Sequence, residues 1–236
     1  MSNSYFRFKQ FTIEQGLCAM KVTTDACIQG AWTPIDAGVK RVLDVGAGTG
    51  LLALMLAQRD PNIFIDALEL DEQTAKQACD NFYHSGWGER LSVVTGDARN
   101  FSSTCKYDLI ITNPPFFNNS LASDDPKKIL ARHNLSLGYD ELLKVMDDNL
   151  EESGYVSILL PHPEYLLFSS LSKKTGWHET ARLSVMHRPG ADVKRVVGIW
   201  SKKKSALVEQ TLIIRGNGES YSEEFSALLA PFYLAL

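Results

Sequence analysis

Short apolar runs alternate with longer amphipathic segments along most of the chain. The runs with the length and composition of strands are 41–45, 63–70, 91–95, 107–112, 155–160, 181–186, 193–200 and 207–214. Segments with helical spacing or helix-ending residues are 51–57, 72–84, 139–150 and 164–174. Strands that alternate with helices form parallel sheets, so the pattern predicts an α/β fold with a mostly parallel sheet covered on both faces. The last runs are expected to pair antiparallel at one edge.

The composition is that of a compact globular protein. Of 236 residues, 44% are hydrophobic and 22% are charged, which excludes a disordered or fibrous chain. Residues 1–13 mix aromatic and basic side chains, so they form neither a signal peptide nor a membrane span. The four cysteines form no C-x-x-C pair, which argues against a metal site. We expect one domain over residues 1–236 that is monomeric, with no metal and no membrane contact. We expect it in the cytoplasm, where its thiols are reduced.

A glycine-rich turn lies between the first predicted strand and the first predicted helix. Residues 44–50 read Asp-Val-Gly-Ala-Gly-Thr-Gly. Glycines allow a sharp turn and let a ligand lie against the backbone, so the turn is a candidate nucleoside-cofactor loop. The alternative is a turn that serves helix packing alone. A dinucleotide fingerprint needs a glycine where Leu51 stands, which disfavours NAD.

Acidic residues follow the next two strands. Glu69 closes the second strand, where its carboxylate can accept hydrogen bonds from both hydroxyls of a ribose. Asp97 follows the third strand, beside Ala98, and is placed to accept from an adenine amino group. The alternatives are a surface carboxylate at Glu69 and a simple turn residue at Asp97.

The most specific signal follows the fourth strand, where residues 113–116 read Asn-Pro-Pro-Phe. An exocyclic amine of a base is a poor nucleophile, because its lone pair is delocalised into the ring. The side chain of Asn113 and the carbonyl of Pro114 can accept the two N–H bonds and aim that lone pair at a methyl donor. Phe116 can stack on the base, a contact of about 1–3 kcal/mol. This motif favours N-methylation over oxygen or carbon methylation; the alternative is a loop that caps a strand and buries Phe116.

Together these motifs resemble the class I S-adenosylmethionine-dependent methyltransferases. The resemblance implies a Rossmann-like fold, with a seven-stranded, mostly parallel sheet and an antiparallel edge hairpin. It implies S-adenosylmethionine as the cofactor, with Asp44, Gly46 and Gly48 at its methionine end. Lys21 and Thr24 belong to the stretch Lys-Val-Thr-Thr-Asp, which resembles the segment that covers the methionine carboxylate in amino-methylating members. Residues 1–38 would then extend over the cofactor and substrate site; the alternative for 21–25 is a helix cap.

A closer resemblance covers nearly the whole chain. The runs 8–11, 18–22, 50–59 and 214–216, with later matches at 221–223 and 232–234, are similar to the bacterial valine tRNA (adenine-N6)-methyltransferase family. The resemblance implies N6-methylation of the adenosine on the 3′ side of the anticodon of a valine tRNA. Phe116 stands where tyrosine is found in relatives, and Asn-Pro-Pro-Phe also resembles ribosomal RNA guanine-N2 methyltransferases.

An RNA partner requires a local basic surface, because the net charge is −4. Between Lys173 and Lys204, nine basic residues stand against two acidic ones, and Lys194 and Arg195 are candidate RNA contacts. The alternative for this stretch is a solvated face. Arg132, in the polar stretch 118–134, is a further candidate for the backbone of a flipped nucleotide.

Other classes remain as rivals. A release-factor glutamine methyltransferase uses a similar Asn-Pro-Pro motif, but that family carries a helical domain before its glycine loop, where only about forty residues stand here. A DNA adenine methyltransferase adds a large target-recognition region. An inactive RNA-binding module is the alternative outside enzymes, and cofactor binding distinguishes it.

Overall fold

The computed structural model describes residues 3–114, 137–216 and 218–236. Its strands are β1 (Tyr5–Arg7), β2 (Thr12–Glu14), β3 (Arg41–Val45), β4 (Phe64–Glu69), β5 (Leu91–Thr95), β6 (Tyr107–Thr112), β7 (Leu150–Pro161), β8 (His178–Met186), β9 (Val193–Ser201) and β10 (Val208–Ile213). Its helices are α1 (Thr24–Trp32), α2 (Leu51–Arg59), α3 (Glu72–Tyr83), α5 (Tyr139–Asn149), α6 (His162–Lys174) and α7 (Glu223–Leu229), with the short 3₁₀ turns η1 (Gly88–Arg90) and η2 (Ala98–Asn100).

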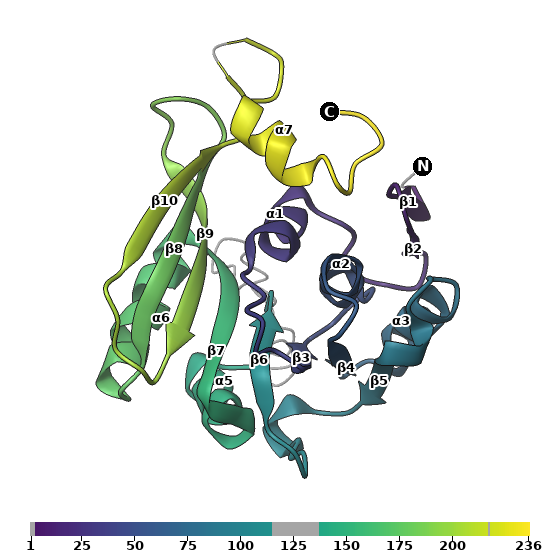
Figure 1. Cartoon of the computed structure of the whole chain (residues 1–236), viewed down its shortest axis with the longest axis vertical. Helices are drawn as coiled ribbons and strands as arrows, with labels where there is room; N and C mark the ends of the chain where they lie inside the picture. Colours follow the sequence, from purple (N-terminus) through teal and green to yellow (C-terminus); the bar gives the residue numbers. More distant parts are fainter. Residues whose placement is uncertain (1–2, 115–136, 217) are drawn as a thin grey trace, which may run out of the picture.

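The main sheet has eight strands in the order β10-β8-β9-β7-β6-β3-β4-β5 (Figure 1). The five strands β7, β6, β3, β4 and β5 run parallel to one another, and β9 runs antiparallel to both β7 and β8. The Rossmann-like, mostly parallel fold is therefore confirmed. The count of seven strands is one too low, and β10 pairs with β8 in parallel, whereas the last runs were all expected to pair antiparallel.

Alternating side chains build a core on each face of the sheet. Along β3, Val42 belongs to one core and Leu43 to the other, because successive strand residues point to opposite faces. The first core packs against α1, α2 and α7, and the second packs against α5 and α6 (Figure 1). Both faces are covered, so the free edge for ligands is the one at which the parallel strands end.

Strand β7 begins earlier than its apolar run. The sequence predicted a helix end at residues 151–154, but the strand starts at Leu150, directly after α5. The pairing with β6 shifts in register between Tyr107 and Leu109, and Gly154 lies at this irregularity. A Cβ at Gly154 would stand 2.8 Å from the carbonyl oxygen of Asp108. This glycine therefore marks a close backbone approach inside a strand, where the sequence indicated a turn.

The terminal segments contain elements that the apolar pattern did not predict. Helix α1 is buried on nearly all sides, so it has no polar face that would give it an amphipathic period. A Cβ at its Gly30 would lie 2.8 Å from the sulfur of Met55, so α1 and α2 pack closely. The hairpin of β1 and β2 meets the carboxyl-terminal segment, where the Lys9 N–H donates to the carbonyl of Phe232 at 2.8 Å. Strands of three residues and contacts between chain ends leave little local signal.

Candidate active site

The glycine loop joins β3 to α2 with left-handed backbone at three positions. Gly46, Gly48 and Gly50 have φ of 71°, 57° and 79°, which side-chain-bearing residues rarely adopt. A Cβ at Gly46 or Gly48 would meet nothing within 4 Å, so open space adjoins the loop at both positions. A Cβ at Gly50 would stand 2.4 Å from the ring of Phe82, so this glycine serves close packing. Two glycines therefore face a space that a ligand can fill.

Glu69 holds the loop from the end of β4. Its Oε2 accepts from the N–H of Gly48 at 2.9 Å, and its Oε1 accepts from the N–H of Asp71 at 3.0 Å. The side chain is half-buried. Each carboxylate oxygen has a second lone pair, so both can still accept from a ribose. The two backbone bonds fix the orientation in which such an acceptor would be presented.

Asp44 is completely buried at the base of the loop. Its Oδ2 accepts from the N–H of Ala53 in the first turn of α2, while Oδ1 has no hydrogen-bond partner among the described residues. Burial raises the pKa of Asp44 to about 7; the bond from Ala53 opposes this rise, and the charge of Glu69 adds to it. A buried carboxylate with an unused oxygen would be stabilised by a cationic ligand.

Asp97 and Ala98 lie where β5 ends. Asp97 caps η2, and its carboxylate accepts from the backbone N–H and the guanidinium of Arg99, with the closest ion-pair distance at 2.5 Å. These hydrogen bonds lower the pKa of Asp97. Arg99 is partly exposed, so an adenine amino group would have to share the carboxylate with it or displace it.

Asn113 and Pro114 follow β6 on the other side of the loop. Thr112 is paired with Val45, so Asn113 is level with Gly46 across the two parallel strands. Asn113 is half-buried, and its Oδ1 is buried without a hydrogen-bond partner among the described residues; Pro114 is buried. Phe116 and Arg132 lie outside the described residues. The strand register therefore places Asn113, with its unpartnered amide oxygen, next to the first glycine of the loop.

The segment at residues 21–25 does form a helix start. Thr23 caps α1 by accepting from the N–H of Ala26 at 3.2 Å, and Thr24 is exposed. Lys21 donates to the carbonyl of Asn3 at 3.1 Å, within the amino-terminal segment. The helix-cap alternative thus holds for Thr23. The cofactor contacts of Lys21 and Thr24 stay predictions.

Arg195 lies at the same end of the sheet, opposite Pro161 at the carboxyl end of β7. Its Nε is 3.1 Å from Oδ2 of Asp25, which connects β9 to the start of α1. Burial raises the pKa of Asp25 and the charge of Arg195 opposes this rise. Lys194 is exposed beside it. The two candidate RNA contacts therefore lie at the edge that carries Asn113, with Arg195 already in an ion pair.

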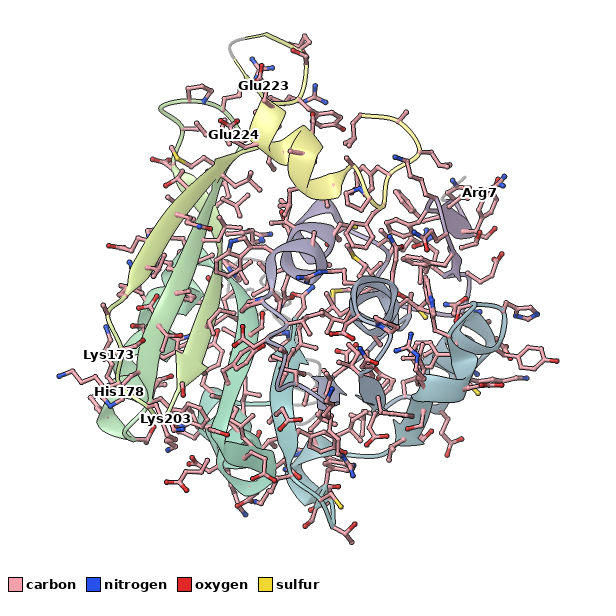
Figure 2. The ribbon with its side chains drawn as sticks, viewed as in Figure 1. Arg7, Lys173, His178, Lys203, Glu223 and Glu224 are labelled. Carbon is pink, nitrogen blue, oxygen red and sulfur yellow. The ribbon has the colours of Figure 1, made fainter. Side chains whose placement is uncertain are left out.

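The basic stretch does not form one surface. Because β9 runs the length of the neighbouring strand β7, Lys194 and Lys203 lie at opposite ends of β9. Figure 2 shows Lys173, His178 and Lys203 together at the end away from the candidate site. Lys202 belongs to this distal group and pairs with Asp147 at 2.6 Å. The local excess of positive charge in the sequence is thus divided between two ends of the molecule.

Two neighbouring residues support the site and were not predicted from the sequence. Asn81 in α3 accepts from the N–H of Glu14 and donates to the carbonyls of Glu14 and Thr49, each at 2.9 Å. It therefore fastens the amino-terminal segment to the glycine loop. Gln29, completely buried in α1, donates to the carbonyl of Thr112 at 3.0 Å. The only sequence signal is a polar amide inside each helix, where such residues are unfavourable without another partner.

Within the described ranges, no group of three or more His, Cys, Asp or Glu side chains is arranged to hold a metal ion. None of the helices in those ranges has the length and apolar character needed to span a bilayer.

Comparison with known proteins first defines the class. Residues 33–138 match the family described as methyltransferase small domain. The fold is similar to that of a predicted O-methyltransferase from Agrobacterium tumefaciens, with a TM-score of 0.67 over 90% of this chain and 99% of that one at 16% identity. An identity this low concerns the fold alone. The fold and the matched family are those of a class I methyltransferase.

Full-length relatives then define the family. A protein from Bacteroides fragilis is 40% identical over 239 residues, covering all of both chains, and one from Shigella dysenteriae is 41% identical over 232 residues, covering 97% of this chain and 94% of its own. Both carry the name tRNA1(Val) (adenine(37)-N6)-methyltransferase. The chain belongs to this family, as its resemblance in sequence predicted.

Proposed function

We propose that this protein transfers a methyl group from S-adenosylmethionine to the N6 amine of adenine 37 in tRNA1(Val). One observation carries the proposal: Asn113, whose buried Oδ1 has no hydrogen-bond partner among the described residues, stands level with Gly46 of the open glycine loop. The curated relatives that share the full length of the chain carry this activity in their names.

The residues present fit the cofactor. The space beside Gly46 and Gly48 accepts a ligand without a change of backbone, and the free lone pairs of Glu69 suit a ribose. The unused Oδ1 of Asp44 suits the positively charged amino group of a methionine. When bound, S-adenosylmethionine supplies a methyl group activated by a positively charged sulfur and leaves as the neutral thioether. We propose that Asp97 and Ala98 adjoin the adenine, and that Lys21 and Thr24 adjoin the methionine carboxylate.

Asn113 orients the accepting amine. Its Oδ1 and the carbonyl of Pro114 each accept one N–H of the amine, so the nitrogen lone pair points toward the methyl carbon. With S-adenosylmethionine bound, the N–C bond would form as the C–S bond breaks, and the positive charge would pass from sulfur to nitrogen. The methylated nitrogen then loses one proton to solvent, so no strong general base is required. Phe116, which lies outside the described residues, is proposed to stack on the adenine.

The RNA is proposed to approach the end of the sheet that carries Asn113. Lys194 and Arg195 are its proposed phosphate contacts, together with Arg132. Residues 1–38 are proposed to extend over the cofactor. In support, Asn81 accepts from the N–H of Glu14 and donates to the carbonyl of Thr49, so the amino-terminal segment is held beside the glycine loop. We propose that the enzyme acts as a single-domain monomer in the cytoplasm, where tRNA is found.

The test is transfer of labelled methyl from S-adenosylmethionine to a tRNA1(Val) transcript, with nucleoside analysis of the product. The matched control is the same transcript with guanine at position 37. N6-methyladenosine formed only in the first transcript supports the proposal. N2-methylguanosine in the control or in ribosomal RNA would assign the enzyme to the guanine-specific class. Label in neither RNA but in a protein glutamine would overturn the RNA substrate.

A further inference from the structure

We propose that Gln29 is a positioning residue for Asn113, whose side-chain oxygen is proposed to accept a hydrogen bond from the substrate amine. Gln29 lies in α1 and is completely buried. Its Nε2 donates to the carbonyl of Thr112 at 3.0 Å and to the carbonyl of Ser157 at 3.3 Å. The Thr112 carbonyl belongs to the peptide group that joins Thr112 to Asn113. The amide of Gln29 thus holds the last peptide before the proposed catalytic residue.

That peptide group is held from two directions. The Oγ1 of Thr112 donates to the carbonyl of Val45 in β3 at 2.8 Å, while its carbonyl accepts from Gln29 in α1. Val45 directly precedes the first glycine of the loop. These bonds fix the end of β6 against both the helix and the glycine loop. The direction in which the Asn113 side chain leaves the backbone depends on that fixed peptide.

The chemistry of the side-chain amide explains why a glutamine stands at this position. Its Oε1 is buried and has no hydrogen-bond partner among the described residues. A buried acceptor without a partner costs free energy, and the hydrogen bonds that the Nε2 of Gln29 donates to the carbonyls of Thr112 and Ser157 offset that cost. With the amide reversed, its oxygen would face two carbonyl oxygens, which is unfavourable. The two N–H donors therefore explain why a glutamine occupies this position.

Thr33 provides a matched control in the same polar cluster. It follows α1, is completely buried, and its Oγ1 is 2.7 Å from the Oγ of Ser157. Ser157 also adjoins Gln29, with 3.4 Å between Nε2 and Oγ. The recorded side-chain bond of Thr33 reaches β7 and not β6. Thr33→Val therefore removes a buried hydrogen bond from the cluster without releasing Thr112.

This inference rests on the proposed function and is tested with the tRNA1(Val) transcript. Gln29→Met should lower kcat by about ten- to hundredfold, because small misplacements of a reacting group have effects of that size. The KM for tRNA and the affinity for S-adenosylmethionine should stay within about twofold, since Gln29 touches neither proposed binding surface. Thr33→Val should lower the melting temperature while kcat stays within about twofold of wild type.

A second variant keeps the test decisive where Gln29→Met does not fold. Gln29→Glu preserves the shape and donates at most one hydrogen to the two carbonyls, so kcat per folded molecule should fall as well. Folded molecules are counted by cofactor titration. A kcat at wild-type level in the folded Gln29 variants, or an equal loss in Thr33→Val, would overturn the positioning role. A wild-type protein that methylates no adenine would instead overturn the proposed function.

Discussion

The two ends of the parallel strands use the same kinds of polar residue in different ways. Near the amino ends, Asp66 accepts from Tyr107 at 2.8 Å, from Arg41 at 3.2 Å and also from Ser92. Asp108 accepts two backbone N–H groups, including that of Arg41 at 2.9 Å. These carboxylates connect neighbouring strands, and their contacts explain their presence.

At the carboxyl ends the corresponding groups have unused capacity. Asp44 and Asn113 each bury an oxygen without a hydrogen-bond partner among the described residues, next to a loop with open space. Stability does not account for such atoms, because unpaired buried acceptors are costly. The comparison teaches that Asp44 and Asn113 differ from Asp66 and Asp108 in hydrogen-bond partners, a difference that residue type alone does not show.

The largest expected effect is at Asn113, where the variant tests whether the unpartnered oxygen serves methyl transfer. Asn113→Ala should lower kcat for methyl transfer by about 100- to 1,000-fold, the usual cost of removing one group aligned with a transition state. The affinity for S-adenosylmethionine should change little. Single-turnover assays and calorimetric titration measure the two quantities. A variant that loses cofactor binding along with activity would show that Asn113 supports the loop instead.

The next effect concerns the pH dependence set by Asp44. Its folded pKa, raised to about 7, lies above the ordinary value of 3.8. The folded state therefore retains a proton that the unfolded state has lost, and stability falls as pH rises from about 4 to about 7. Asp44→Asn should remove about 2–3 kcal/mol of the difference in unfolding free energy between pH 5 and pH 8 in the cofactor-free protein. Urea unfolding at both pH values checks this. Equal pH dependence in the two proteins would contradict the raised pKa.

Asp66 tests the structural end of the sheet. Asp66→Ala removes the shared partner of Tyr107, Arg41 and Ser92. We expect a loss of about 2 kcal/mol in the free energy of unfolding, and an unchanged kcat in the folded fraction. Denaturant unfolding and the methyl transfer assay measure both. A lower kcat with an unchanged free energy of unfolding would show that Asp66 serves catalysis, and would contradict a purely structural role for the amino-end carboxylates.

Glu69 combines both uses, because it holds the loop and retains free lone pairs. Glu69→Gln should weaken S-adenosylmethionine binding by about tenfold, since a neutral amide oxygen accepts more weakly than a carboxylate. The effect should appear in the dissociation constant with a small change in kcat at saturating cofactor. An unchanged dissociation constant would leave Glu69 with its loop contacts alone.

The smallest effect compares two basic residues at opposite ends of β9. Lys194→Ala should weaken tRNA binding about threefold. It should also reduce the slope of the logarithm of the binding constant against the logarithm of salt concentration by about one. Lys203→Ala serves as the control and should leave both quantities unchanged, since it lies at the distal end. Filter binding at several salt concentrations checks both variants. Equal effects would show that RNA covers both ends.

The sequence by itself determined the alternation of strands and helices, the glycine loop and the order of the chemical motifs. These features depend on neighbouring residues: apolar runs predict strands, and glycines permit the left-handed turn at residues 46–50. The family followed from motifs spread over the whole chain. The specific roles of the candidate site residues remain predictions.

Tertiary structure alone decided which polar groups have partners. The pairing of Arg195 with Asp25, the hydrogen bond from Gln29 to the Thr112 carbonyl and the parallel alignment of β10 with β8 each join segments that are apart in the sequence. The basic stretch 173–204 is divided because β9 runs the length of the neighbouring strand β7. Residues before and after β9 therefore lie at opposite ends of the strands. Local sequence sets backbone preference, but a hydrogen bond or ion pair depends on distances that only the packed chain fixes. For that reason the sequence indicated the chemistry, and the fold decided which residues are free to perform it.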